Sequence, residues 1–269
     1  HLSLNEAFLD SAQIRGNAVS RARMLGYVPT SELAAKATVT VVVDASEVDN
    51  RPDNLSLPRG TKFNSEVTGY PYGFVATESS SATLDTGTNK YTFSDVEVAE
   101  GIYNSIKYRV DNDIQIQKHQ IPHKNVDIST LRVRVQANEE SSSYDIYTKF
   151  ETLLQVDGTS KIFHLQENSN GFYEVYFGDG VIGSKPINNN IVTLDYVYTN
   201  GKDANGASSF SLADSLLTGS SSTTTSVSNS AGGADQEGLE SIRYNAPITF
   251  ASQNRAVTSD DYRSIIKRD

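Results

Sequence analysis

Val39-Thr40-Val41-Val42-Val43 is the stretch of sequence that decides the fold. Its β-branched side chains are stiff and pack well on a pleated surface, so they favour extended backbone over a helix. Five residues is also an ordinary length for a strand. The stretch therefore predicts a β-strand, with an acidic surface loop beginning at Asp44.

Further short segments of apolar and polar alternation follow along the chain, each bounded by Asn, Asp, Gly or Ser. Short strands at this spacing are typical of sandwich-like or barrel-like packing. A tract at 207–230 is dominated by Ser and Thr, which is the composition of a linker but also of an exposed strand plus loop. The alternating segments lie at residues 72–77, 90–98, 102–110, 114–117, 131–135, 144–156, 161–166, 171–177 and 191–198.

The N-terminal end of the chain has helical periodicity instead. From Asn5 to Leu25, small and apolar residues recur at steps of three and four, which places them on one face of a predicted helix. Gly26 and Pro29 then end this helix, because Gly accepts left-handed backbone and Pro cannot continue a helix. One predicted helix therefore opens the chain.

Helical signals return at the other end. Asp235 can cap a helix over residues 236–244, and a capping box at residues 258–261 precedes a further helix. The sequence thus predicts an α+β fold that is mostly β. We expect three parts: an N-terminal helical segment at 1–36, a β-rich core domain at 37–230, and a C-terminal helical segment at 231–269 that starts a truncated further domain.

The N-terminal helix has a face of small and apolar residues, which let another helix approach closely. The same face would also suit burial on the protein's own sheet, and the sequence leaves both readings open. We predict a helix interface with another chain, made of Ala7, Ile14, Ala18, Ala22 and Leu25.

Charge and composition argue against several classes of protein. The net charge of −10 disfavours nucleic acid or an anionic membrane as the main partner, since both require clustered Lys and Arg. The absence of Cys excludes disulfides and Cys-ligated metal sites. No apolar run approaches the roughly 20 residues that cross a bilayer, and no signal-peptide pattern opens the chain. Because the sequence begins at His1 and stops within a helical pattern, we expect a fragment of a longer protein.

Phe177-Gly178-Asp179-Gly180 is the most conspicuous local motif. A carboxylate on a tight turn is compatible with acid–base chemistry, but Gly and Asp are also the residues that accept positive φ in a hairpin. We therefore predict a structural turn of Gly178, Asp179 and Gly180. Gly180 would supply the positive φ between strands around Tyr176 and Ile182.

The remaining candidate chemistry gives no catalytic, cofactor or metal site. A glycosidase needs a second carboxylate at a suitable distance, and the sequence favours neither Asp195 nor Glu174 for that role. His119 and His123 are four residues apart, but Pro122 between them spoils the helical geometry of a two-histidine metal site. A group of acidic residues lacks the spacing of a calcium loop and predicts a solvated surface: Asp44, Glu47, Asp49 and Asp53.

Three stretches resemble motifs of one protein family, in order and over nearly the whole chain. The Ser/Thr tract at 220–230 departs from that pattern. The chain is identified as a member of the baseplate J-like family, and it resembles the inner-ring baseplate wedge subunit of contractile-tailed phages. The stretches are Asp10 to Leu25 with Gly26-Tyr27-Val28-Pro29-Thr30-Ser31 and Pro58-Arg59-Gly60-Thr61; Tyr176-Phe177-Gly178-Asp179-Gly180 with residues 198–206; and Gly232-Gly233-Ala234-Asp235 with Asn254-Arg255-Ala256-Val257-Thr258 and Asp261-Tyr262.

This resemblance implies a structural role in the virion, in the tail baseplate, after assembly in the host cytoplasm. It implies homodimers, a ring of copies around the tail hub, contacts with other baseplate wedge proteins and a part in the rearrangement on infection. We expect no enzymatic activity and no cofactor, and we expect neither nucleic acid nor a membrane as a partner. The alternative is a carbohydrate-binding host-recognition domain, or a glycan-cleaving tail enzyme. The 14 Tyr would suit sugar stacking, but the absence of Trp weakens both.

Overall fold

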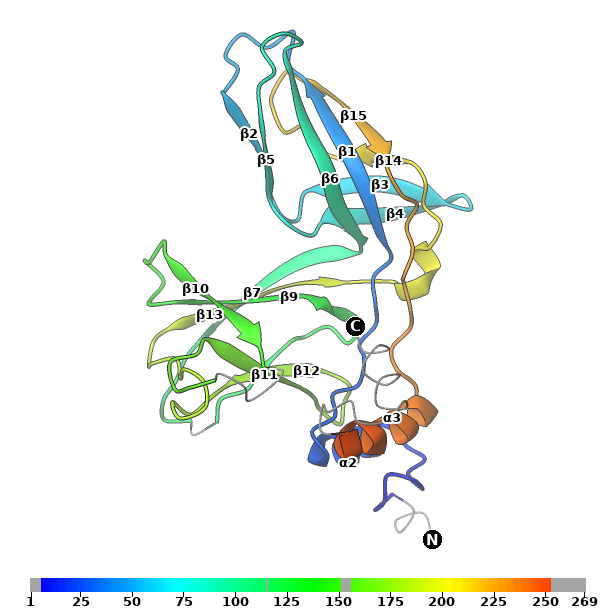
Figure 1. Cartoon of the computed structure of the whole chain (residues 1–269), viewed down its shortest axis with the longest axis vertical. Coiled ribbons are helices and arrows are strands. Elements are labelled where there is room, and N and C mark those ends of the chain that lie inside the picture. Colours follow the sequence, from blue (N-terminus) through cyan, green and yellow to red (C-terminus); the bar gives the residue numbers. More distant parts are fainter. Residues whose placement is uncertain (1–5, 115, 151–155, 253–269) are drawn as a thin grey trace.

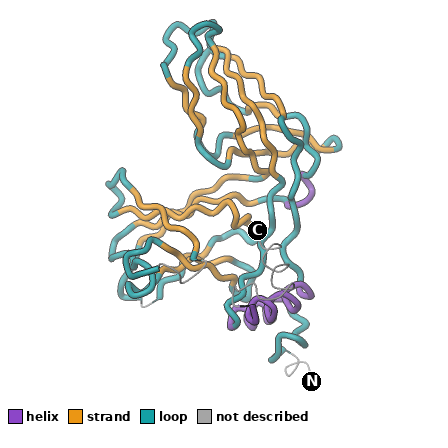
Figure 2. Tube along the Cα trace, viewed as in Figure 1, coloured by secondary structure: helices purple, strands orange, loops and turns teal. Residues whose placement is uncertain are grey.

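The computed structural model describes residues 6–114, 116–150 and 156–252 of the chain. In this part of the chain, two large β-sheets and a pair of helices are stacked along the longest axis of the molecule, and a small two-stranded sheet joins the upper one (Figure 1). Strands make up most of the regular structure, and one helix lies toward each end of the sequence (Figure 2). The predicted fold class, α+β and mostly β, is confirmed.

The upper sheet of Figure 1 contains the strand predicted around Val41. That strand is β1, and Val39, Val41 and Val43 are fully buried because alternate side chains face the core. Val41 pairs with Phe93 on one side and Thr224 on the other. The upper sheet has the order β14 (Phe210–Leu212), β3 (Lys62–Val67), β4 (Tyr70–Ala76), β6 (Lys90–Glu100), β1 (Lys36–Asp44) and β15 (Ser221–Ser226).

The Ser/Thr-rich tract supplies an edge of the upper sheet. Its strand β15 pairs antiparallel with β1 from Ser221 to Ser226, so the prediction of a strand plus loop is confirmed. A small two-stranded sheet packs against the same core. It consists of β2 (Asn54–Leu57) and β5 (Ser80–Thr83), whose Leu55, Leu57 and Ala82 are buried in that core.

The lower sheet has its own hydrophobic core. Its strand β13 is buried along its length except at Tyr198. The strands β7 and β9 cover its two edges, and Val192, Leu194 and Tyr196 on one face belong to the core. The order is β7 (Ile102–Arg109), β13 (Ile191–Tyr198), β9 (Val126–Gln136), β10 (Tyr144–Lys149), β11 (Ile162–Glu167), β12 (Tyr173–Phe177) and β8 (His119–Gln120). A short 3-10 helix, η1 (Gly201–Ala204), follows β13.

The two sheets meet at Gly101, the one residue between β6 and β7. Gly101 has a φ of 126°, and a Cβ there would lie 2.2 Å from the carbonyl oxygen of Tyr198. The preceding Glu100 is buried and accepts hydrogen bonds from the Thr199 hydroxyl (2.6 Å), the Asn200 backbone N–H (2.9 Å) and the Asn200 side-chain amide (2.7 Å). We call this group the sheet junction.

A second set of polar contacts joins the sheets on the other side of β9. Asp127, fully buried at the start of β9, accepts a hydrogen bond from the backbone N–H of Ala34 at 3.0 Å. Arg59 donates to the carbonyl oxygen of Thr130 and lies over the ring of Tyr103. Because buried polar groups are costly to leave unpaired, these contacts fix how one sheet is placed against the other.

The helices α2 (Arg15–Met24) and α3 (Leu239–Ser252) form a pair at the lower end of the molecule (Figure 1). The prediction that the first helix starts at Asn5 is wrong for the described residues, because Glu6 accepts hydrogen bonds from the backbone of Gln13 and the side chain of Asn17 and holds residues 6–14 in turns. The end near Leu25 is confirmed, and Gly26 has a φ of 75°.

The second helix also differs from its predicted range of 236–244. It starts three residues later and continues through Pro247 to Ser252, with Ile242 and Ala246 buried against α2. Packing against a partner helix thus outweighs the missing N–H of the proline. The further helix predicted after the capping box at 258–261 lies outside the described residues.

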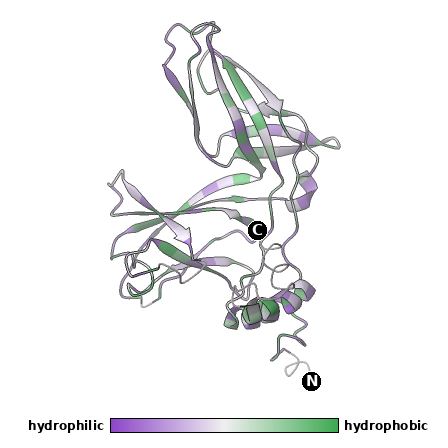
Figure 3. Cartoon of the chain, in the orientation of Figure 1, coloured by the Kyte–Doolittle hydropathy of each residue, from purple (hydrophilic) through white to green (hydrophobic). Residues whose placement is uncertain are grey.

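Hydrophobic residues concentrate in the strands of both sheets and in the helix pair (Figure 3). Neither of the described helices is long and apolar enough to cross a bilayer.

Candidate functional site

Most residues of the predicted interface lie on the helix pair or beside it. They fall into two groups, one buried and one exposed. Ala18 and Ala22 are fully buried and pack on Ile242 and Ala246 of α3, with Leu25 half-buried beside them. The small residues therefore allow close approach of a helix, as their size predicts, but the helix beside them belongs to the same chain.

The other predicted interface residues face solvent. Ala7 and Ile14 are exposed, as are further apolar side chains of this region that the periodicity did not single out. These side chains lie on α2 and α3 or in the segment just before α2. In the sequence they can be recognised as apolar residues outside the small-residue stripe. The exposed apolar residues of the helix pair are Phe8, Ile14, Met24, Tyr244 and Phe250.

An ion pair anchors the helix pair to the lower sheet. The guanidinium of Arg15, at the start of α2, donates two hydrogen bonds to the carboxylate of Glu167 at the end of β11, one of them 3.1 Å long. The Glu167 side chain is fully buried and also accepts a hydrogen bond from Gln236. The hydroxyl of Tyr173, whose pKa is raised by burial, donates to the carbonyl oxygen of Pro29.

Glu237 ties the segment after α2 to the start of α3. Its carboxylate accepts hydrogen bonds from the Tyr27 hydroxyl and the Thr30 backbone N–H, each at 2.9 Å, and from Ser241 and Asn245. The two helices therefore form one unit that is held to the lower sheet at several points.

The predicted turn at residues 178–180 follows β12. Gly180 has a φ of 91°, and the Asp179 carboxylate accepts hydrogen bonds from the backbone N–H groups of Val181 (2.9 Å) and Ile182 (3.2 Å), which lower its pKa. The expected second strand around Ile182 is wrong. The chain instead forms a loop as far as Asn190, because the neighbours of β12 in the sheet are β11 and β8.

The remaining candidates for chemistry are occupied by structural contacts. Asp195 pairs with Arg134 at 2.6 Å, and its pKa is lowered by Arg134 and Ser105 against the opposing effect of burial. Glu174 accepts a hydrogen bond from Gln166. His123 stacks on Tyr198 with the ring centroids 4.1 Å apart. Among the described residues, no three metal-ligating side chains are grouped.

The comparisons with known proteins agree with this architecture. Residues 34–101 match the model of the baseplate wedge protein gp6, domain II, and residues 102–205 match the model of the bacteriophage baseplate wedge protein gp6, third domain. The border between the two matches falls at Gly101 in the sheet junction. The first match contains β1 to β6, which include four of the six strands of the upper sheet, and the second contains all strands of the lower sheet.

A relative supports the same family over a longer range. The baseplate wedge protein gp6 of Enterobacteria phage T4 is 30% identical over 97% of this chain. The chain spans 41% of the length of that relative. The two consecutive domain matches and this alignment show that the chain belongs to the gp6 family of baseplate wedge proteins, which are structural components of the phage tail baseplate.

Proposed function

We propose that this chain is the rigid part of a baseplate wedge subunit that holds neighbouring subunits at a fixed separation. The observation that carries the proposal is the sheet junction, where Glu100 and Asp127 are buried and hydrogen-bonded across the two sheets. An assembly that rearranges stores its transition in a few interfaces between rigid bodies. Two sheets fixed to each other suit that role.

The helix pair would supply a contact with another chain. Its small-residue face is filled within the molecule, so the contact falls to the exposed apolar side chains, of which Met24 is 73% and Tyr244 69% exposed. Aromatic residues and Met are enriched at the centres of protein interfaces. We therefore move the proposed interface from Ala18 and Ala22 to the outer surface that includes Ile14.

Dimers, a closed ring around the tail hub and contacts with other wedge proteins complete the proposal. These are the properties expected of an inner-ring subunit of the baseplate J-like family, and that finer assignment stays a prediction. A ring built from one protein needs surfaces that repeat on every copy. The predicted boundaries at residues 36 and 230 also stay predictions, and we propose that α2 and α3, which lie outside them, act as one helical unit.

Charge introduced on the outer surface of the helix pair tests the contact. In the full-length protein, Met24→Glu together with Tyr244→Glu should weaken self-association by about tenfold or more, because an unpaired carboxylate is costly where water is excluded. Sedimentation measures the association. Tyr70→Glu is the matched control, because Tyr70 is equally exposed on the β3–β4 hairpin of the upper sheet.

Circular dichroism and the melting temperature should be unchanged in both variants. Equal association of the double variant and the control would contradict the helix interface. A monomeric wild-type protein that also fails to enter baseplates would contradict the proposed function itself.

A structural role requires no catalysis by this chain. Asp179 is committed to backbone N–H groups of its own turn, and Asp195 to Arg134 and Ser105. We propose that both carboxylates serve the fold.

A further inference from the structure

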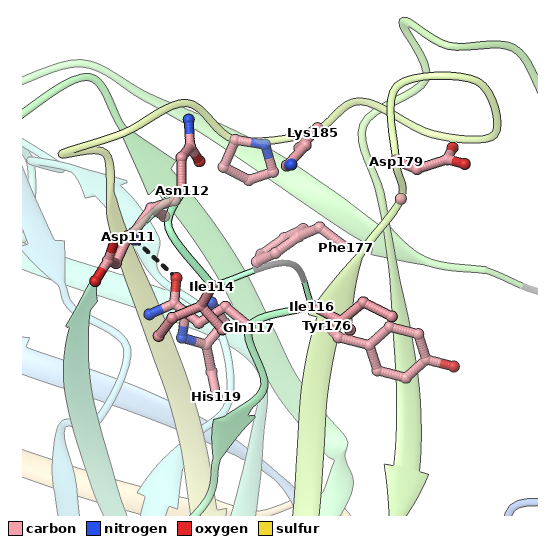
Figure 4. A pocket seen from close by; sticks show the side chains of 13 residues that line it. Asp111, Asn112, Ile114, Ile116, Gln117, His119, Tyr176, Phe177, Asp179 and Lys185 are labelled. Atoms are coloured by element: carbon pink, nitrogen blue, oxygen red, sulfur yellow. Dashed lines mark hydrogen bonds between the residues drawn. The ribbon is translucent and has the colours of Figure 1, made fainter.

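A pocket of about 170 Å³ lies at the edge of the lower sheet, where β8 begins (Figure 4). Apolar side chains dominate its wall, and Phe177 lies between the segment that carries Lys185 and the one that carries Ile114 (Figure 4). His119 closes its inner end. The main apolar lining residues are Val110, Ile114, Ile116, Tyr176, Phe177 and Pro186.

The pocket exists because the edge strand of the sheet is too short to fill it. β8 has two residues, and they pair with Glu174 and Val175 of β12. Among the described residues, Tyr176 and Phe177, the last two residues of β12, therefore have no partner strand on that side. The space that a longer edge strand would occupy is left open.

Hydrogen bonds hold both walls of the pocket in place. On one wall, the Gln117 side chain accepts from the backbone N–H of Asp111 (2.9 Å, dashed in Figure 4) and donates to the carbonyl oxygen of Arg109 (3.0 Å). On the other wall, the N–H of Ser184 donates to the carbonyl oxygen of Ser160 at 2.7 Å. The site is thus preformed, which lowers the entropic cost of binding.

Exposed apolar residues lie in one wall of this pocket and on the loop that contributes its opposite wall. Ile116 is 64% exposed in its wall, and the loop after Asp179, which forms the opposite wall, carries Val181 at 73% together with exposed Ile182 and Ile187. Clustered exposed apolar residues mark contact sites more reliably than scattered ones.

A buried polar atom in the pocket wall also lacks a partner. His119 is 1% exposed, its ring lies between those of Tyr108 and Phe177, and its Nδ1 has no hydrogen-bond partner among the described residues. Buried polar groups in folded proteins are nearly always paired. Within the described part of the chain, this polar atom is therefore left without a partner.

The charges around the pocket indicate what fills it. Asp111 and Asp179 line the pocket together with one lysine, Lys185, and the whole chain has a net charge of −10. A second copy would bring the same acidic surface, and like charges brought together oppose association. A partner segment with Lys or Arg beside its apolar residue matches this rim.

The volume sets the size of that apolar residue. A dry, apolar cavity of roughly 150 Å³ is known to hold a benzene ring. We propose that this pocket receives an aromatic side chain from a Lys- or Arg-flanked segment of a different baseplate protein. The inference rests on the proposed function, since it places the partner in the baseplate.

Site-specific photo-crosslinking in assembled baseplates tests the proposal. The full-length protein carries p-benzoylphenylalanine in place of Ile116 in one sample and in place of Tyr70, which is 69% exposed on the upper sheet, in the control. Mass spectrometry then identifies the crosslinked peptide. We expect Ile116 to capture one segment of another baseplate protein, with an aromatic residue next to Lys or Arg, and Tyr70 not to capture it.

A synthetic peptide of the captured segment gives the second measurement. Replacing its aromatic residue with Ala should weaken binding to this protein by about tenfold or more. Ile116→Asp in the pocket wall of this protein should do the same, while Tyr70→Asp should not. The proposal would be overturned if neither the Ala substitution nor Ile116→Asp weakened binding.

Three crosslinking outcomes also overturn it: capture of a second copy of this chain, capture of a segment without an aromatic residue, or no capture above the control. In each of these the protein still enters baseplates, so the proposed function stands. Failure to enter baseplates at all would overturn both.

Discussion

Arg15 and Glu167 join two parts of the molecule that lie 152 residues apart in sequence. Removing one partner of such a pair leaves the other charge buried, which costs about 3 kcal/mol or more. Arg15→Met should therefore lower the free energy of unfolding by about 3 kcal/mol, measured by urea denaturation, because Gln236 alone remains beside the Glu167 carboxylate.

The double variant Arg15→Met with Glu167→Leu is the control for this prediction. Apolar residues of similar volume often replace a buried ion pair at little cost, so the double variant should be more stable than Arg15→Met alone. If the double variant lost as much stability as the sum of the two single ones, the pair would not interact.

His119 makes stability depend on pH. Burial lowers its pKa from 6.5 to about 4, so the unfolded chain binds a proton at a pH where the folded chain does not. This contribution is present above pH 6.5 and is lost as the pH falls from 6.5 toward 4. Between pH 7 and pH 5 we expect a loss of about 2 kcal/mol in the free energy of unfolding.

The variant His119→Phe separates this residue from other titrating groups. Burial also lowers the pKa of His164, so the difference between wild type and variant is the informative quantity. In the variant, most of the loss in the free energy of unfolding between pH 7 and pH 5 should disappear. Urea denaturation at the two pH values measures it. An unchanged pH dependence would show that His119 is protonated in the folded protein as readily as in the unfolded one.

At the scale of single elements, the sequence predicts those strands and helix ends that depend on residues close together in the chain. The β-branched run around Val41 predicts β1, and Gly26 with Pro29 predicts the end of α2. The start of α2 was missed because Glu6 binds backbone N–H groups that a longer helix would use. The strand predicted around Ile182 does not form, because β12 pairs instead with β11, which precedes it in the chain, and with the distant β8.

The turn after β12 offers a prediction about two glycines that differ in kind. Gly178 has an ordinary φ, but a Cβ there would lie 2.0 Å from the carbonyl oxygen of Ile182, whereas Gly180 has a positive φ with nothing within 4 Å. Gly180→Ala should therefore cost about 1 kcal/mol through backbone strain. Gly178→Ala should cost more, because backbone atoms must move.

Thermal denaturation of the two variants ranks these costs, with Gly69→Ala as a control in another turn that has positive φ and open space. Gly180→Ala and Gly69→Ala should lower the melting temperature by similar amounts. A smaller effect for Gly178→Ala than for Gly180→Ala would show that the close approach at Ile182 is not required by the fold.

At the scale of the whole molecule, the composition predicts a β-rich protein but not two sheets. The contacts that join the two sheets are long-range: Glu100 accepts a hydrogen bond from Asn200, and Asp127 accepts one from Ala34. No periodicity in the sequence marks such pairs. The same limit applies to the site, because the helix that covers Ala18 and the walls around Phe177 are brought together by folding alone.

Glu100 tests whether the two sheets behave as one body. In wild type we expect a single cooperative transition by calorimetry, since the sheet junction is buried and hydrogen-bonded. Glu100→Ala removes the acceptor for Thr199 and Asn200 and should cost about 2 to 4 kcal/mol. Because each sheet keeps its own core, this loss should fall on the coupling between them and split the transition in two.

Thr92→Ala, an exposed change on the same strand β6, should leave a single transition close to the wild-type temperature. Two transitions already present in the wild type would mean that the sheets unfold independently, and a rigid spacer would then have to depend on contacts with other subunits. A single, lower transition in Glu100→Ala would mean that Asp127 and Arg59 couple the sheets without help from Glu100. Only the split transition in Glu100→Ala, beside unchanged behaviour of Thr92→Ala, assigns the coupling to the buried carboxylate next to Gly101.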